Sequence, residues 1–230
     1  MKRFLLICFF PFFLFAQNES AAVLSAKKIV LSPFENLKVF SGIDIELVRS
    51  DGDSLLIESE APDEVVSVVK GNVLKLRLGL EHLLQKSKTL IKVYHSHPID
   101  HIELNQGAQL HTQSTIKQTS LSLFLQEGAQ AKIAVELEKL AVKVQSGAKF
   151  FPTGSAKNLI IQTTSGGACE ADQLIAEQAE VKASLGGIVY VNATELVDAK
   201  SSINATIRVH GKPVKLISKE SVGGKVVEMQ

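Results

Sequence analysis

A glycine recurs every 19 to 21 residues through the middle of this sequence, and this repeat constrains the fold more than any other feature. Similar segments surround the glycines, namely LSLFLQEGAQ, LAVKVQSGAK, LIIQTTSGGA and AEVKASLGGI, and an earlier copy reads IELNQGAQ. A fixed period of this length is typical of repeat architectures, in which each copy stacks on the next. The repeat glycines are Gly107, Gly128, Gly147, Gly166 and Gly186.

Apolar and polar residues alternate before each repeat glycine, which is the pattern of a β-strand with one buried face. Leu121, Leu140 and Leu159 begin three of these runs. The alternation continues after the glycine, and the small residue that follows suits a tight corner. The glycine supplies the positive φ that this corner needs, at no steric cost. Helix propensity over stretches such as 136–143 is a weaker signal than a register shared by several copies.

One repeat therefore predicts one rung of a coil, made of a strand, a glycine corner, a second strand and a variable third side. We predict an all-β solenoid with rungs of about 20 residues, stacked about 4.8 Å apart by parallel backbone hydrogen bonds. Cys169 falls on an interior position of this coil, in line with Ala131, Phe150 and Val189. We expect the thiol to be buried.

The N-terminus has the pattern of a signal peptide. Lys2 and Arg3 precede an almost wholly apolar run from Phe4 to Phe15, and Ala16 offers a small residue for cleavage. This run is shorter than the roughly 20 residues of a membrane-spanning helix, and no later stretch approaches that length. We predict that residues 1–16 are removed on export and that the mature chain has no transmembrane segment.

Removal of the first sixteen residues leaves a formal charge of −1 and a single cysteine, Cys169. An intrachain disulfide is then impossible, so stability must come from burial and hydrogen bonding. A charge so close to zero argues against nucleic acid as a partner.

The remainder divides into a lead segment at 17–33 and a single domain at 34–230. In this domain we expect N-terminal cap strands at 34–79, the repeats at 80–210 and a C-terminal cap at 211–230. Cap strands are predicted at Phe34–Val48, Ser54–Ser59 and Asn72–Leu78. A short helix is predicted over 62–69, because Pro62 and two acidic residues suit its first turn. The cap would cover the exposed edge of the first rung.

Three long segments make the chain resemble the head GIN domain family of auto-transporter adhesins. They are FENLKVFSGIDIELVRSDGDSLLIESE, LIKVYHSHPIDHIELNQGAQ and INATIRVHGKPVKLISKESVGGKVVE, and the resemblance runs from about Phe34 to Glu228. It implies a right-handed parallel β-helix-like fold and a cell-surface or periplasmic setting. The sequence differs in having QEGAQ and NQGAQ where the family favours serine before the glycine.

The histidines cluster between the cap and the first repeats, at His95, His97, His101 and His111. A metal site needs three or four such ligands that converge, with further groups to orient them. We interpret these histidines as solvated surface residues, with a metal or catalytic cluster as the alternative. The sequence shows no nucleophile motif, no phosphate-binding glycine loop and no evident pair of carboxylates. We therefore predict no catalytic residues, no metal site and no cofactor.

Amide side chains recur at outward positions two residues before and two after the corner glycines. Such ladders either hydrogen-bond to one another along the stack, which is the favoured interpretation, or contact an extended polymer such as a glycan. The candidate ligand-contact face comprises Asn105, Gln109, Gln126, Gln130, Gln145 and Lys149.

These observations predict an exported, non-enzymatic surface or envelope protein that acts as an adhesin or interaction module. Its location would be the periplasm, the outer surface or the extracellular space. Its partner would be a cell-surface or envelope component, either glycan or protein. The alternatives are a secreted glycan-binding or scaffold protein and a carbohydrate-active β-helix enzyme.

Overall fold

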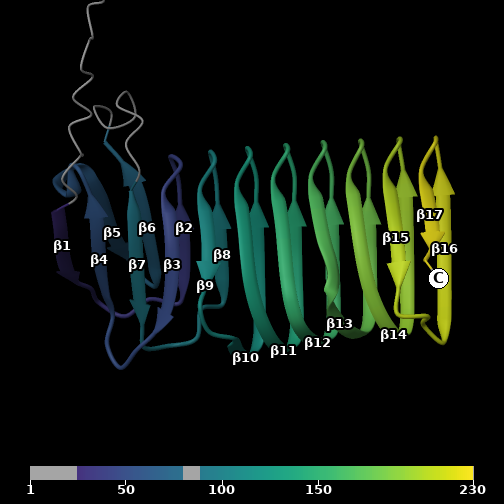
Figure 1. Cartoon of the computed structure of the whole chain (residues 1–230), viewed down its shortest axis with the longest axis horizontal. Coiled ribbons are helices and arrows are strands. Elements are labelled where there is room, and N and C mark those ends of the chain that lie inside the picture. The colour runs from purple at the N-terminus through teal and green to yellow at the C-terminus, as the bar shows by residue number, and fades with distance from the viewer. Residues whose placement is uncertain (1–24, 80–88, 230) are drawn as a thin grey trace, which may run out of the picture.

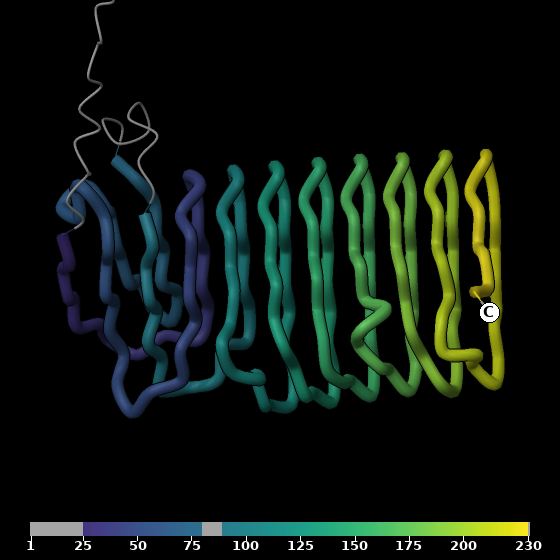
Figure 2. The backbone as a smooth tube through the Cα atoms, in the orientation of Figure 1, coloured from purple at the N-terminus to yellow at the C-terminus, as the bar shows by residue number. Residues whose placement is uncertain are grey.

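The computed structural model describes residues 25–79 and 89–229, and in this part the chain forms a β-solenoid (Figure 1). The solenoid has about seven turns, with rungs of about 19 residues. Each rung is a narrow loop that closes in a tight turn along one edge of the molecule (Figure 2). The predicted signal peptide lies outside the described residues. Among those residues, no helix is both long enough and apolar enough to span a bilayer.

Each rung has two sides, so the strands form two sheet faces with the core between them. The β10 face contains β6 (Val73–Leu78), β2 (Asn36–Val39), β8 (His101–Leu104), β10 (Ile116–Leu125), the C-terminal halves of β11 (Gln130–Val144), β12 (Lys149–Thr163), β13 (Ala168–Ala183) and β14 (Ile188–Ser202), and β16 (Lys215–Ser221). The β9 face contains β7 (Leu90–His95), β3 (Asp44–Arg49), β9 (Gln109–Thr112), the N-terminal halves of β11 to β14, β15 (Thr206–His210) and β17 (Lys225–Glu228).

The predicted third side is absent, because the chain bends directly from one face to the other within β11 to β14. In β11 the bend falls at Glu138 and Lys139, two successive exposed residues that interrupt the alternation of buried and exposed positions. Alternation resumes at Leu140 with the opposite sheet. A residue pair that breaks the period of two therefore marks the change of face.

The tight turns have positive φ at both central residues, as in type I′ turns. At Gln106 and Gly107 the φ values are 53° and 73°, and the Ala108 N–H donates to the Asn105 carbonyl over 3.1 Å. The Gly107 N–H donates to the Glu127 carbonyl of the next rung over 2.9 Å. The other four repeat glycines occupy the same position, which three further turns share at Ser41-Gly42, Ile203-Asn204 and Val222-Gly223.

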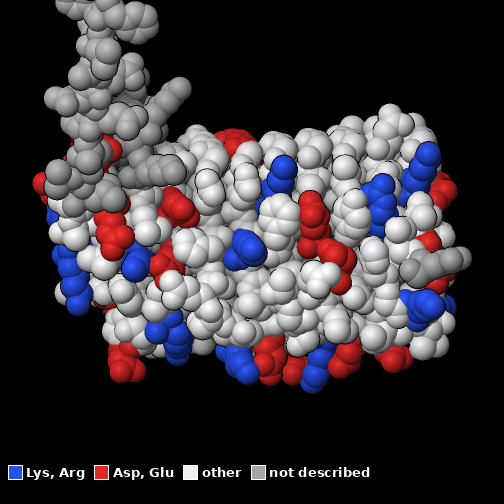
Figure 3. Space-filling model, in the orientation of Figure 1, with Lys and Arg blue, Asp and Glu red and all other residues white. Residues whose placement is uncertain are grey.

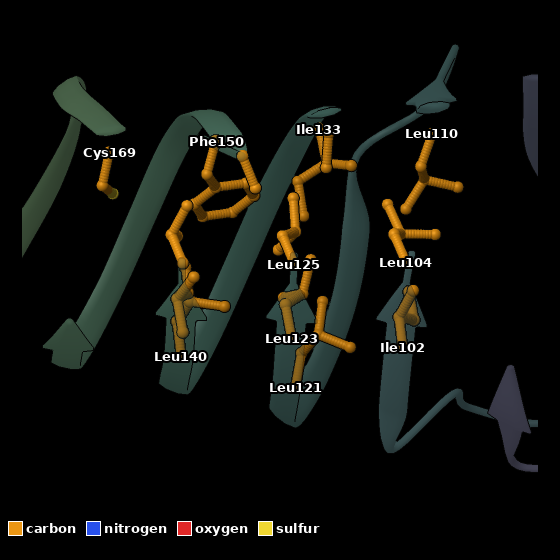
Figure 4. Packing of buried hydrophobic residues seen from close by; sticks show 14 of the residues in the cluster. Ile102, Leu104, Leu110, Leu121, Leu123, Leu125, Ile133, Leu140, Phe150 and Cys169 are labelled. Atoms are coloured by element: carbon orange, nitrogen blue, oxygen red, sulfur yellow. The ribbon is translucent and has the colours of Figure 1, made fainter. Parts of the chain in front are cut away.

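The core consists of aliphatic ladders in which equivalent residues of successive rungs lie over one another. Leu121 pairs with Leu140, and Leu140 pairs with Leu159, which confirms the predicted stack. Cys169 is fully buried between Phe150 and Val189, as expected. Figure 4 shows the side chains of Leu121, Leu140, Phe150 and Cys169, among others, directed into the space between the two faces.

The N-terminal end departs from sequential order. The rung formed by β2 and β3 lies between two rungs that come later in the chain, because β2 pairs in parallel with β6 and β8, and β3 pairs with β7 and β9. The predicted strand over 34–48 is therefore wrong as a single strand, since the turn at Ser41 and Gly42 divides it into the two sides of a rung.

Three antiparallel strands cover the open end of the first rung. On the β9 face, β4 (Ser54–Ser59) pairs with β7 and β1 (Ser25–Val30) pairs with β4. On the β10 face, β5 (Val65–Lys70) pairs with β6. The predicted helix over 62–69 is wrong beyond its first turn, since only Pro62–Glu64 forms a 3₁₀ helix. The valines of β5 favour a strand, and β6 supplies its partner.

The last rung described carries polar residues at inward positions. Leu216, Ser218 and Glu220 continue the inward row of Val197, Ala199 and Ser201. The Glu220 carboxylate accepts the Val226 N–H over 2.6 Å, which satisfies a backbone donor of β17. An inward charge of this kind discourages further strand pairing at an edge.

Candidate binding surface

The six residues predicted to form one ligand-contact face lie on opposite sides of the molecule. Asn105, Gln126 and Gln145 directly follow strands of the β10 face, whereas Gln109, Gln130 and Lys149 begin strands of the β9 face. The tight turn between the two sets reverses the chain. The structure therefore divides the predicted face into two rows.

The first of these rows is a hydrogen-bonded ladder. Gln145 Nε2 donates to Gln126 Oε1 over 2.9 Å, and Gln126 Nε2 donates to Asn105 Oδ1 over 2.5 Å. Asn105 is 1% exposed, and its Nδ2 donates to the Val39 carbonyl over 3.3 Å. Hydrogen bonds between these three amides link successive rungs, as the favoured interpretation of the ladder predicted. Gln109, Gln130 and Lys149 are exposed.

The four histidines do not converge. His95 is buried, and its Nδ1 lies 2.7 Å from the His97 carbonyl oxygen, so the expectation of a solvated His95 is wrong. Burial lowers its pKa. His101 lies on the β10 face near Ser122, and His111 lies on the β9 face 3.3 Å from an Asp44 oxygen. Within 25–79 and 89–229, no three His, Cys, Asp or Glu side chains form a metal-binding group.

The strand register aligns a row of lysines on the β10 face. It occupies the outward position four residues before the corner glycines, and equivalent residues lie on adjacent strands. We call these residues the lysine row; in stacking order they are Lys75, Lys38, Glu103, Phe124, Lys143, Gln162, Lys182, Lys200 and Lys219.

Carboxylates beside this row form ion pairs with some of its lysines. Lys182 pairs with Glu180 at 2.6 Å, and this carboxylate raises the lysine pKa. Lys200 pairs with Asp198 at 3.1 Å. Lys143 Nζ lies 5.2 Å from the centroid of the Phe124 ring, within the range of a cation–π contact.

Three shallow depressions adjoin one another along this face. The first, of about 360 Å³, lies over Phe124, Lys143 and Ile160. The second shares Lys143 and continues past Lys182 to Lys200, and the third shares Ile160. Together they form a trough that crosses successive rungs. Apolar, cationic and hydroxyl groups line it, and the carboxylates of Glu180 and Asp198 line its third depression.

Positive charge is concentrated on the β10 face. Between the bend and the tight turns, seven basic side chains point outward on the rung strands of this face against three acidic ones: Lys38, Lys75, Arg77, Lys143, Lys182, Lys200 and Lys219 against Glu103, Glu180 and Asp198. The β9 face, seen in Figure 3, carries a mixture of both signs. Its outward charged residues that reach the surface are Lys92, Lys132, Lys149, Arg208 and Lys225 against Asp44, Glu136, Glu170 and Asp172, whereas Glu46 is buried.

Residues 33–213 match the family model described as "Putative auto-transporter adhesin, head GIN domain". The chain belongs to this family. The head GIN domain therefore includes the β2–β3 rung and the repeats, and the match ends just before β16. No curated protein matches the chain in sequence.

Solved structures with low sequence identity share the head GIN fold of this chain. A putative adhesin from Bacteroides fragilis is 18% identical, with a TM-score of 0.78 over 90% of this chain and 97% of its own. A putative adhesin from Parabacteroides merdae is also 18% identical, with a TM-score of 0.74 over 90% and 96%. A protein from Parabacteroides distasonis described as a putative lipid binding protein is 16% identical, with a TM-score of 0.69 over 90% and 97%.

Proposed function

We propose that this head GIN protein is an exported, non-enzymatic interaction module of the cell envelope that binds its partner on the β10 face. The observation that carries this proposal is the trough over Phe124, Lys143 and Lys200, which crosses several rungs of one sheet. A stacked β-sheet holds the backbone of such a surface rigid, so the backbone loses little freedom on binding. The family name and the names of the structural neighbours support an adhesive role.

The proposal is tested with the purified protein and envelope fractions from bacteria. We expect saturable retention of the protein on one or more fractions, with no release of reducing ends from a polysaccharide panel. Turnover that disappears when a single carboxylate is changed would contradict the proposal and favour the carbohydrate-active enzyme. Failure of the protein to bind any of the fractions would also contradict the proposal.

The location is tested separately in intact cells. Export predicts a processed chain that lacks residues 1–16 and is found in the envelope or the medium. Mass spectrometry of the N-terminus and protease treatment of whole cells measure both properties. An unprocessed chain in the cytosol would contradict this part of the proposal.

A further inference from the structure

The lysine row follows the solenoid axis, and six of its nine members are lysines. Its members lie on adjacent strands, which are spaced by about 4.8 Å. Lys182, Lys200 and Lys219 occupy three successive rungs without a break. Like charges directly opposite one another on neighbouring strands repel, so this arrangement costs free energy in the unliganded protein.

The positive charge of the row exceeds that of the nearby carboxylates. Glu180 and Asp198 pair with Lys182 and Lys200, but no ion pair of Lys143 or Lys219 occurs within 4.0 Å among the described residues. Lys143 and Lys219 are both exposed. The row therefore presents charge that an anionic ligand can neutralise.

The two sides of the row differ in chemistry. On the side of the tight turns lies a parallel row of amides and hydroxyls at Gln145, Thr164, Ser184 and Ser202. The carboxylates of Glu180 and Asp198 lie on the other side. A linear ligand between the lysines and the turns would contact cations and hydroxyls while avoiding the carboxylates. A planar anionic surface would meet the carboxylates as well.

We infer that the β10 face binds a linear anionic polysaccharide whose chain runs along the solenoid axis. This inference rests on the proposed function and names its ligand class. Carboxylate, sulfate or phosphate groups of the polymer contact Lys143, Lys182 and Lys200. Its hydroxyls bond to the row that contains Thr164 and Ser184, and Phe124 supplies an apolar surface for a sugar ring.

The test compares two triple variants of the full protein. The first, Lys143→Gln with Lys182→Gln and Lys200→Gln, removes three charges from the β10 face. The control, Lys132→Gln with Lys149→Gln and Lys225→Gln, removes three from the β9 face. Dextran sulfate is the anionic probe and unmodified dextran is the neutral one. Thermal unfolding of both variants establishes that the fold is retained.

We expect the wild type to bind dextran sulfate and not dextran, with affinity that falls as salt is added. The first variant should bind dextran sulfate at least about tenfold more weakly, since each lysine contributes several-fold at an anionic surface. The control variant should change by less than about twofold. An equal loss in both variants, or no loss in either, would overturn the inference.

Two further outcomes separate the possible explanations. If anionic phospholipid vesicles bind through the same lysines and dextran sulfate does not, the polysaccharide inference is wrong and the face binds membranes. If both variants still bind envelope fractions as the wild type does, the lysine row is not the binding site. The proposal that the protein is an interaction module is then retained.

Discussion

At the residue scale, the tight turns show what a sequence pattern can and cannot predict. The repeat glycines were predicted as corner residues because they recur at a regular spacing. The residue before each repeat glycine also has positive φ, at Leu185 as well as at polar residues, and so does Ile203 before Asn204. No sequence signal indicated this. Asn204 fills a glycine position because asparagine tolerates the left-handed region. The turn type, rather than side-chain chemistry, sets the positive φ of the residue before the glycine.

Ile203 is a β-branched residue with a φ of 49°, a conformation that favours glycine or asparagine. We expect Ile203→Asn to stabilise the protein by about 1 kcal/mol, because the side chain is 42% exposed and little burial is lost. The midpoint of urea unfolding measures this change. Ser146→Asn, at an equivalent turn with a φ of 52°, is the control and should produce a smaller gain. A lower midpoint of urea unfolding for Ile203→Asn would show that the backbone of Ile203 is not strained.

Two glycine substitutions separate backbone strain from steric overlap. Gly147 has a φ of 73° and open space where a Cβ would lie, so Gly147→Ala should cost about 1 to 2 kcal/mol from the backbone alone. Gly154 also has positive φ, and an added Cβ would overlap the Val135 carbonyl oxygen. Gly154→Ala should cost more than about 3 kcal/mol. Equal losses in chemical denaturation would show that β12 relaxes around the new methyl group.

Cys169 should react with thiol reagents only when the protein unfolds. It is fully buried, and this burial raises the pKa of its thiol, so the reactive thiolate is scarce. The rate of labelling by a chromogenic disulfide reagent, with and without guanidinium, measures this. Rapid reaction of the native protein would contradict the interior position.

At the element scale, strands in which apolar and polar residues clearly alternate were predicted well. The strands with which they pair were not. Ser54–Ser59 is β4 with the predicted bounds, and the interior ladders follow the repeats. By contrast, the sequence over 34–48 does not show that it forms two strands flanked by later ones. Alternation indicates which side chains are buried, but it carries no information about the neighbouring strand. The lysine row was missed although its members in the repeats share one offset from the glycines, because that offset holds a lysine only at Lys143 and Lys182 there. Strand pairing adds Lys75, Lys38, Lys200 and Lys219.

The pairing of β2 with β8 predicts a stability contribution that depends on pH. Burial alone would raise the pKa of Glu103, but its hydrogen bonds and the charge of Lys38, 2.8 Å away, outweigh this and lower it. A carboxylate with a lowered folded-state pKa stabilises the fold above its ordinary value of 4.5. This contribution is lost as the pH falls through the folded-state value.

We therefore expect Glu103→Gln to cost about 0.5 to 1 kcal/mol at pH 7 and progressively less as the carboxyl is protonated. Denaturation at a series of pH values measures the difference from the wild type. Glu136→Gln removes a more exposed partner, of Lys117, and should have a smaller effect. A difference that is independent of pH would contradict the role of the ion pair.

At the scale of the whole molecule, the repeat makes the rung the unit of stability. Deletion of 130–148 removes 19 residues, and β12 would then pair in the position of β11, since their register is constant. We expect this variant to keep a cooperative unfolding transition at lower stability. Deletion of 130–139 removes about half a rung and should prevent folding. Circular dichroism and thermal unfolding distinguish the two, and equal behaviour would contradict a modular stack.

The position of the β2–β3 rung has a consequence for the export that we propose. An exported chain would release this rung before most of its other residues, yet the neighbours of the rung on both sides are the later segments β6 to β9. The pairing of this rung would need more than sixty further residues, the span from Arg49 to Thr112. Each of the repeats that follow could add to a finished rung as it emerges. We therefore expect assembly after export to begin with the interleaved end and to proceed towards the C-terminus.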